Sequence, residues 1–156
     1  MILCKYNAQL LNRSEFSTIF TQYCGYQNKY GATALIKLLK YCNAELDESY
    51  NIRLYELYEK EKNIIDNNGW TPLMHLCYKD NLDSIKCLII SYLLRLFPEL
   101  SDNPGDLRKW NKSMKMSFLI GGAKYVNLNH PEFQQVWWDA REEISNYGSV
   151  LLIHIA

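Results

Sequence analysis

Apolar residues recur along this chain at the three- and four-residue spacing of helix faces. One such stripe runs from residue 82 to 89, and similar stripes occupy residues 12–25, 48–60 and 131–144. We therefore expect helices there, with these inward-facing residues: Phe16, Ile19, Phe20 and Tyr23; Ile52, Leu54, Leu57 and Tyr58; Leu82, Ile85, Leu88 and Ile89; Phe133, Val136, Trp137, Ala140 and Ile144.

A short turn followed by a short helix is predicted at residues 66–77, with the sequence DNNGWTPLMHLC. Asn, Asp and Gly favour a turn, and Gly69 adopts a positive φ at little cost. Thr71 is suited to cap a helix through its hydroxyl, and Pro72 at the first helical position loses no needed hydrogen bond. Leu73, Leu76 and Cys77 would then face inward.

The same pattern occurs earlier in the chain, at residues 28–39. Gly31 aligns with Gly69 at an offset of 38 residues, and Thr33 aligns with Thr71. A further copy occupies residues 145–156, and a weaker one occupies 111–122, where Met114 takes the glycine position. Self-similarity at this period is typical of helical repeat proteins.

Residues 66–89 resemble an ankyrin repeat, whose pattern runs D-x-x-G-x-T-P-L-H-x-A and continues into a second helix. Met74 stands where that family prefers His. The resemblance implies an all-α, irregular, ankyrin-like helical solenoid of about three to four units with turn or hairpin tips and long loops. It would form a single domain with these units: a cap at 1–27, then 28–65, 66–110, 111–144 and a partial unit at 145–156.

Residues 91–110 have no counterpart in a plain repeat. We expect the second helix of its unit to continue to about Phe97, and an irregular loop to surround Pro98 to Gly105. The final copy ends at Ala156 without a second helix, which suggests either a piece of a longer protein or a covered end.

Composition and charge exclude several classes of function. The 156 residues contain 17 Lys plus Arg and 17 Asp plus Glu, a balance that disfavours binding to nucleic acid or to an anionic membrane. The longest apolar stretch, Cys87 to Phe97, is too short and too polar to span a bilayer. Five cysteines without a CxxC motif indicate reduced thiols. We expect a cytoplasmic protein, with the nucleus as the alternative.

No set of residues suggests catalysis, a cofactor or a metal site. His75 and Cys77 lie two positions apart, on different faces of a helix, and we expect a partly exposed His and a packed Cys. The carboxylates at Asp47, Glu48, Glu59 and Glu61 indicate a solvated loop and helix face. The pair Gly121–Gly122 lacks a phosphate-binding motif and suits close helix packing. No histidine or cysteine spacing suggests zinc.

Binding of another protein is the function that the resemblance implies. In ankyrin repeats, residues beside the turn glycine commonly contact protein partners, and aromatic residues are enriched in binding hot spots. An alternative is that the chain is a recruiting domain of a larger protein, and a second is a small Cys/His hydrolase. The partner-binding positions implied here are Lys29, Tyr30, Ala32, Asn67, Asn68, Trp70, Tyr78, Lys112, Ser113, Lys115, Asn146, Tyr147 and Ser149.

Overall fold

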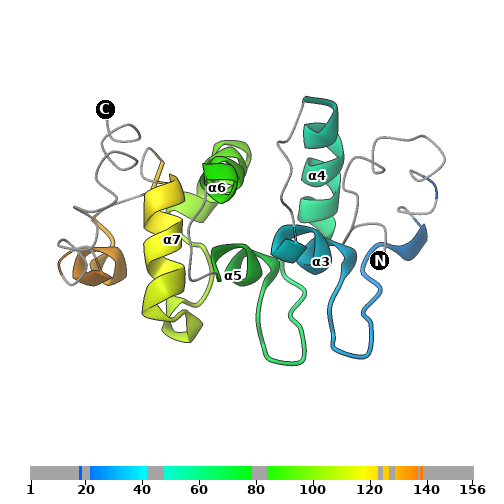
Figure 1. Ribbon diagram of the computed structural model, residues 1–156, viewed down its shortest axis with the longest axis horizontal. Helices are drawn as coiled ribbons and strands as arrows, with labels where there is room; N and C mark the ends of the chain where they lie inside the picture. Colours follow the sequence, from blue (N-terminus) through cyan, green and yellow to red (C-terminus); the bar gives the residue numbers. More distant parts are fainter. Residues whose placement is uncertain are drawn as a thin grey trace. The chain divides into compact units, whose positions relative to one another are not determined.

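The computed structural model describes residues 18, 22–41, 48–78, 84–122, 125–126, 129–136 and 138. Every regular element in these residues is a helix (Figure 1). The prediction of an all-helical fold is therefore confirmed for the described part of the chain. Two compact units divide the chain at residue 76, unit 1 being Met1–Leu76 and unit 2 Cys77–Ala156.

Helix α3, Ala34–Tyr41, belongs to unit 1. The Thr33 hydroxyl accepts a hydrogen bond from the Ile36 N–H at 3.3 Å, which caps the first turn as this residue type favours. Leu35, Ile36, Leu38 and Leu39 are buried, so one apolar face of α3 forms part of the core.

Helix α4, Glu48–Glu61, follows α3 in unit 1. Leu54, Leu57 and Tyr58 are buried, as the apolar stripe predicts. At the other end of the unit, Tyr23 is more than half exposed, so the prediction that it faces inward is wrong. The Tyr23 ring instead meets the Tyr26 ring edge to face at 5.7 Å.

Helix α5, Pro72–Cys77, begins and ends where the sequence predicts. The Thr71 hydroxyl accepts a hydrogen bond from the Met74 N–H at 3.2 Å, the same cap as at Thr33. Leu73, Leu76 and Cys77 are buried, which confirms the expected inward face.

Helix α6, Ser84–Leu96, belongs to unit 2 and packs against helix α7, Lys112–Gly122. Leu88 is 55% exposed, so its predicted inward position is wrong, whereas Ile89 is buried as expected. The buried face of α6 includes Ile90 and Leu94, because the glycines near the end of α7 approach these two side chains. The position of the partner helix therefore decides which face of α6 is covered.

The segment between α6 and α7 contains no long helix, in agreement with the irregular loop expected around Pro98 to Gly105. Helix α6 ends at Leu96, one residue before the predicted end, and the short 3₁₀ helices η2, Pro98–Ser101, and η3, Leu107–Lys109, follow. The Asp106 carboxylate accepts a hydrogen bond from the Arg108 N–H at 3.2 Å and begins η3.

Residues 111–122 differ from the turn-and-helix pattern onto which the sequence alignment placed them. The Asn111 side chain accepts a hydrogen bond from the Met114 N–H at 2.8 Å, so α7 begins at once and Met114 is buried within it. The physical reason is that this copy has Met114 instead of a glycine at the turn position, whereas Asn is a favourable N-cap residue. The predicted turn tip at residues 112–115 is therefore wrong.

The glycine pair of α7 allows close helix packing in unit 2, as the sequence predicts. A Cβ atom on Gly121 would lie 2.9 Å from the Ile90 Cβ, and one on Gly122 would lie 2.8 Å from Val126. Farther along, the Phe118 ring stacks on the Phe133 ring at 5.6 Å. Phe133 and Val136, in the helical segment 131–136, are buried as predicted.

Candidate interaction surface

The turn at residues 28–31 is closed by the side chain of its first residue. The Asn28 Oδ1 accepts hydrogen bonds from the N–H groups of Tyr30 and Ala32, both at 2.9 Å. The Gly31 N–H donates to the Asn28 carbonyl at 2.8 Å, and Gly31 has a φ of 76°. This left-handed conformation favours glycine. The turn presents Tyr30 at its tip.

The turn at residues 66–69 has the same hydrogen bonds, 38 residues later. The Asp66 Oδ1 accepts from the N–H groups of Asn68 and Trp70, at 2.9 and 3.0 Å. The Gly69 N–H donates to the Asp66 carbonyl at 2.9 Å, and Gly69 has a φ of 78°. Asn and Asp both offer a side-chain oxygen at the required place, so the two turns take one shape.

Hydrogen bonds join the two turns side by side. The Asn67 N–H donates to the Tyr30 carbonyl at 3.0 Å, and the Asn67 side-chain amide donates to the Lys29 carbonyl at 3.0 Å. The Gln27 amide adds bonds to the carbonyls of Gly31 and Ile65, at 2.7 and 2.8 Å. In Figure 1 both turns extend from the same side of unit 1, before α3 and before α5. The turn tips therefore form one braced edge.

His75 is buried against Asp66, and the prediction that it is partly exposed is wrong. The His75 Nε2 lies 2.8 Å from the Asp66 Oδ2, and the two residues are 7% and 8% exposed. Burial lowers the pKa of His75, because it disfavours the charged imidazolium; Asp66 opposes this effect, and Lys40 and Lys37 add to it. The neutral ring therefore donates its Nε2–H to the carboxylate.

The Asp66 carboxylate is ionised, and in this form it accepts the hydrogen bonds that hold the turn at residues 66–69. Burial raises its pKa, but the hydrogen bonds from Trp70, His75 and Asn68 outweigh burial, so the pKa of Asp66 lies below its usual value. The Trp70 ring lies against the His75 ring, with centroids 5.2 Å apart. Trp70 is half-buried, and its ring contacts the His75 ring of α5.

Glu61 is fully buried, so the prediction of a solvated carboxylate is wrong at this position. Its Oε1 accepts from the Gly25 N–H at 2.7 Å, and its Oε2 accepts from the Leu35 N–H at 2.8 Å. Leu35 lies in the first turn of α3, where a carboxylate is favoured by the free N–H groups and the helix dipole. Glu59, by contrast, is exposed and pairs with Lys62 at 3.1 Å.

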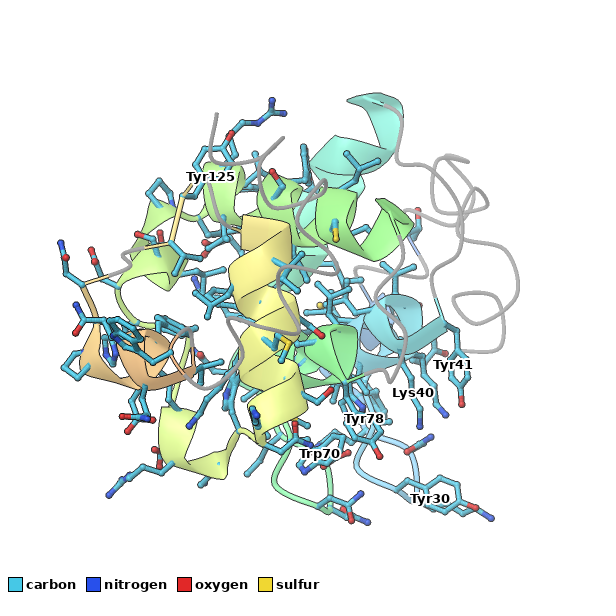
Figure 2. The ribbon with its side chains drawn as sticks, turned by 60° about the vertical axis from the view of Figure 1, so that its left-hand side comes forward. Tyr30, Lys40, Tyr41, Trp70, Tyr78 and Tyr125 are labelled. Atoms are coloured by element: carbon cyan, nitrogen blue, oxygen red, sulfur yellow. The ribbon has the colours of Figure 1, made fainter. Side chains whose placement is uncertain are left out.

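The implied partner-binding residues of unit 1 are mostly accessible. Lys29, Tyr30, Asn67 and Asn68 are exposed, whereas Ala32 is buried. Figure 2 shows Tyr30 extending from its turn. The structure thus brings together the implied positions around both turns, with the exception of the Ala32 side chain.

The implied positions of unit 2 are not arranged in the same way. Tyr78, Lys112 and Ser113 are exposed, the last two on the first turn of α7. Lys115 is largely covered and pairs with Glu132 at 2.9 Å. The remaining implied positions lie outside the described residues: Asn146, Tyr147 and Ser149.

Three residues of α3 complete the surface of unit 1 and were missed in the sequence analysis. The ammonium groups of Lys37 and Lys40 each lie 5.5 Å from the centre of the Tyr41 ring. A signal for this patch is present in the sequence, because residues 22–41 contain three lysines and no Asp or Glu. Averaging charge over the whole chain conceals it.

The described residues contain no group of three or more potential ligands that would hold a metal ion. No helix among them is long and apolar enough to cross a membrane. The pKa of the Cys24 thiol is raised by burial and by the neighbouring Glu61 carboxylate, which is opposite to the activation that a nucleophilic thiol needs.

Comparison with protein-family models, curated proteins and solved structures finds no match to this chain. Within the chain, the turns at 28–31 and 66–69 share one geometry, and each is followed by a Thr-capped helix.

Proposed function

We propose that the chain is a protein-binding module of ankyrin type, with an irregular helical solenoid as its scaffold. The supporting observation is the pair of equivalent turns in unit 1, which present Tyr30 at a braced edge. Tyr30 is 60% exposed. In this function the turn tips and the neighbouring helix face contact a partner protein, and no chemical step takes place.

The bracing of the turns supports a binding role on energetic grounds. Association is opposed by the loss of freedom of each segment that must become ordered. The backbone of the Tyr30 turn is already held by Asn28 and by the neighbouring Asn67. Binding therefore requires little further ordering, and a tyrosine with few rotatable bonds supplies a large contact area.

Photochemical crosslinking tests this function directly. A benzophenone amino acid is placed at position 30, and a matched control carries it at position 55, another exposed tyrosine of unit 1 on α4. We expect position 30 to form a discrete covalent adduct with a cellular protein and position 55 to form none. Mass spectrometry of the adduct identifies the partner.

The fold of both crosslinking variants is checked by circular dichroism and thermal unfolding. Equal adducts from the two positions, or no adduct from position 30 in a folded protein, would remove the turn tips from the binding surface. A Tyr30→Ala variant provides a second readout. It should compete with the wild type for the crosslinked partner at least about tenfold less well, since hot-spot residues contribute this much or more.

A further inference from the structure

Tyrosine and lysine side chains gather on one surface of unit 1. The Lys29 ammonium group lies 5.0 Å from the centre of the Tyr30 ring, and those of Lys37 and Lys40 lie 5.5 Å from that of Tyr41. Tyr30 is 60% exposed and Tyr41 is 36% exposed. We call these five residues, Lys29, Tyr30, Lys37, Lys40 and Tyr41, the tyrosine–lysine surface.

The charge of this surface is positive, although the charges of the whole chain cancel. Two acidic residues of unit 1, Glu61 and Asp66, are buried, and their oxygens accept hydrogen bonds from backbone N–H groups. Among the described residues, no carboxylate lies within ion-pair distance of the three ammonium groups, which instead lie over tyrosine rings. The surface thus offers three positive charges that these carboxylates do not neutralise.

The tyrosine–lysine surface borders the turn at residues 66–69. Figure 2 shows Lys40 and Tyr41 projecting from α3 on the side toward which Tyr30 and Trp70 extend. The Trp70 ring itself lies against the His75 ring of α5, with centroids 5.2 Å apart. A bound segment on this surface would therefore meet positive charge and aromatic area together.

We propose that the tyrosine–lysine surface binds an acidic segment of a partner protein, one in which Asp or Glu residues alternate with apolar side chains. This inference depends on the proposed binding function and specifies its partner class. Carboxylates of the segment pair with the lysines, and its apolar side chains pack on the tyrosine rings. Because the ring contacts already orient the lysines, less side-chain freedom is lost on binding.

An acidic protein segment matches this surface better than a nucleic acid does. Nucleic-acid surfaces carry a large basic surplus. Here the basic residues are three lysines without an arginine, in a chain whose charges cancel. Arginine is the residue that binds phosphate through two parallel hydrogen bonds.

Selection from a random peptide library displayed on phage tests the proposal with the full chain. The bait is the immobilised wild type, and selected peptides are then measured by fluorescence anisotropy. We expect the selected peptides to be enriched in Asp and Glu beside apolar residues. Their affinity should fall at least about tenfold in the Lys37→Gln, Lys40→Gln double variant, and should weaken as salt rises.

A matched control carries Lys60→Gln and Lys62→Gln, the same change of charge on α4 and just beyond its end, and should bind like the wild type. Thermal unfolding verifies that both double variants are folded. Acidic peptides that bind the two double variants equally would overturn the proposal. It would equally be overturned if oligo(dT) or phosphatidylserine vesicles bound through Lys37 and Lys40 while acidic peptides did not.

The outcomes separate this inference from the proposed function. Selected peptides without acidic enrichment that still require Tyr30 would leave the binding function in place and refute the acidic partner. If no selected peptide binds and position 30 forms no crosslink, both the binding function and its partner class are refuted.

Discussion

At the scale of single residues, buried carboxylates hold the backbone of unit 1 in place. The Asp66 carboxylate accepts hydrogen bonds from two backbone N–H groups and one imidazole N–H. The Glu61 carboxylate accepts hydrogen bonds from two backbone N–H groups that belong to separate segments. A buried N–H group without a hydrogen-bond partner costs free energy, so we expect the loss of either carboxylate to lower the free energy of unfolding.

Replacement of Glu61 by Gln should destabilise the protein by about 1–3 kcal/mol, because the amide offers one acceptor oxygen where two N–H groups need partners. The control is Glu59→Gln, two residues earlier, where an exposed ion pair with Lys62 is lost. That change should alter the free energy of unfolding by less than about 1 kcal/mol. Urea unfolding of both variants measures the difference, and equal effects would contradict the assigned role of Glu61.

Acid should destabilise the fold through His75 and Asp66. The pKa of His75 is lowered in the folded state, first by burial, so the unfolded chain takes up a proton at a higher pH than the folded chain does. Stability from this group is complete above about pH 6.5, the value of an unperturbed histidine, and declines as pH falls toward the lower folded pKa. Asp66, whose pKa is also lowered, adds a further loss below about pH 4.

Two measurements check this dependence on pH. The titration of the His75 ring resonances by NMR should give a pKa below that of an unperturbed histidine. In urea unfolding between about pH 7.5 and about pH 5.5, His75→Gln should remove a slope of at most about 1.4 kcal/mol per pH unit. An unchanged slope would show that folding does not shift the pKa of His75, and a ring that titrates above the usual value would show that the protonated ion pair dominates instead.

At the scale of elements, the two turns of unit 1 are equivalent in backbone but not in surroundings. Gly31 and Gly69 have φ values of 76° and 78°. A Cβ on Gly31 would lie 2.6 Å from the Asn67 backbone nitrogen, whereas one on Gly69 would have no atom within 4 Å. The second turn packs against the first, and Gly69 faces open space.

This asymmetry predicts different effects for one substitution. Gly69→Ala should destabilise the protein by about 1–2 kcal/mol, from the left-handed backbone alone. Gly31→Ala should destabilise the protein by about 1–3 kcal/mol more than Gly69→Ala does. The added methyl group forces the two turns apart, so the hydrogen bond from the Asn67 N–H to the Tyr30 carbonyl is lost. Thermal unfolding of the two variants compares these effects, and a larger loss at Gly69 would be inconsistent with the packing of the turns.

At the scale of the whole molecule, the helices were largely predictable and the exposure of particular side chains was not. Helix α5 and the end of α6 lie where the sequence places them, to within one residue. The failures include Leu88, Glu61 and His75, and the turn expected at residues 112–115. Each depends on a neighbouring element or on a competing cap that periodicity does not reveal.

The candidate surface was predictable only in part. Tyr30 and its turn follow from the glycine pattern and the ankyrin resemblance. Lys37, Lys40 and Tyr41 were not predicted to belong to this surface, because they lie on a helix whose orientation depends on its packing. The buried pair of His75 and Asp66 was not predicted either, since nothing in the spacing around His75 indicates that its ring meets Asp66, nine residues earlier.

The sequence by itself determined the helix stripes, the Thr caps and the glycine turns, because each is encoded within a few neighbouring residues. Only the tertiary structure decided which polar groups are buried and which charges remain on the surface. Glu61 meets Leu35 and Gly25 across 26 and 36 positions of the chain. Contacts over such separations form when elements pack, and local patterns do not specify that packing.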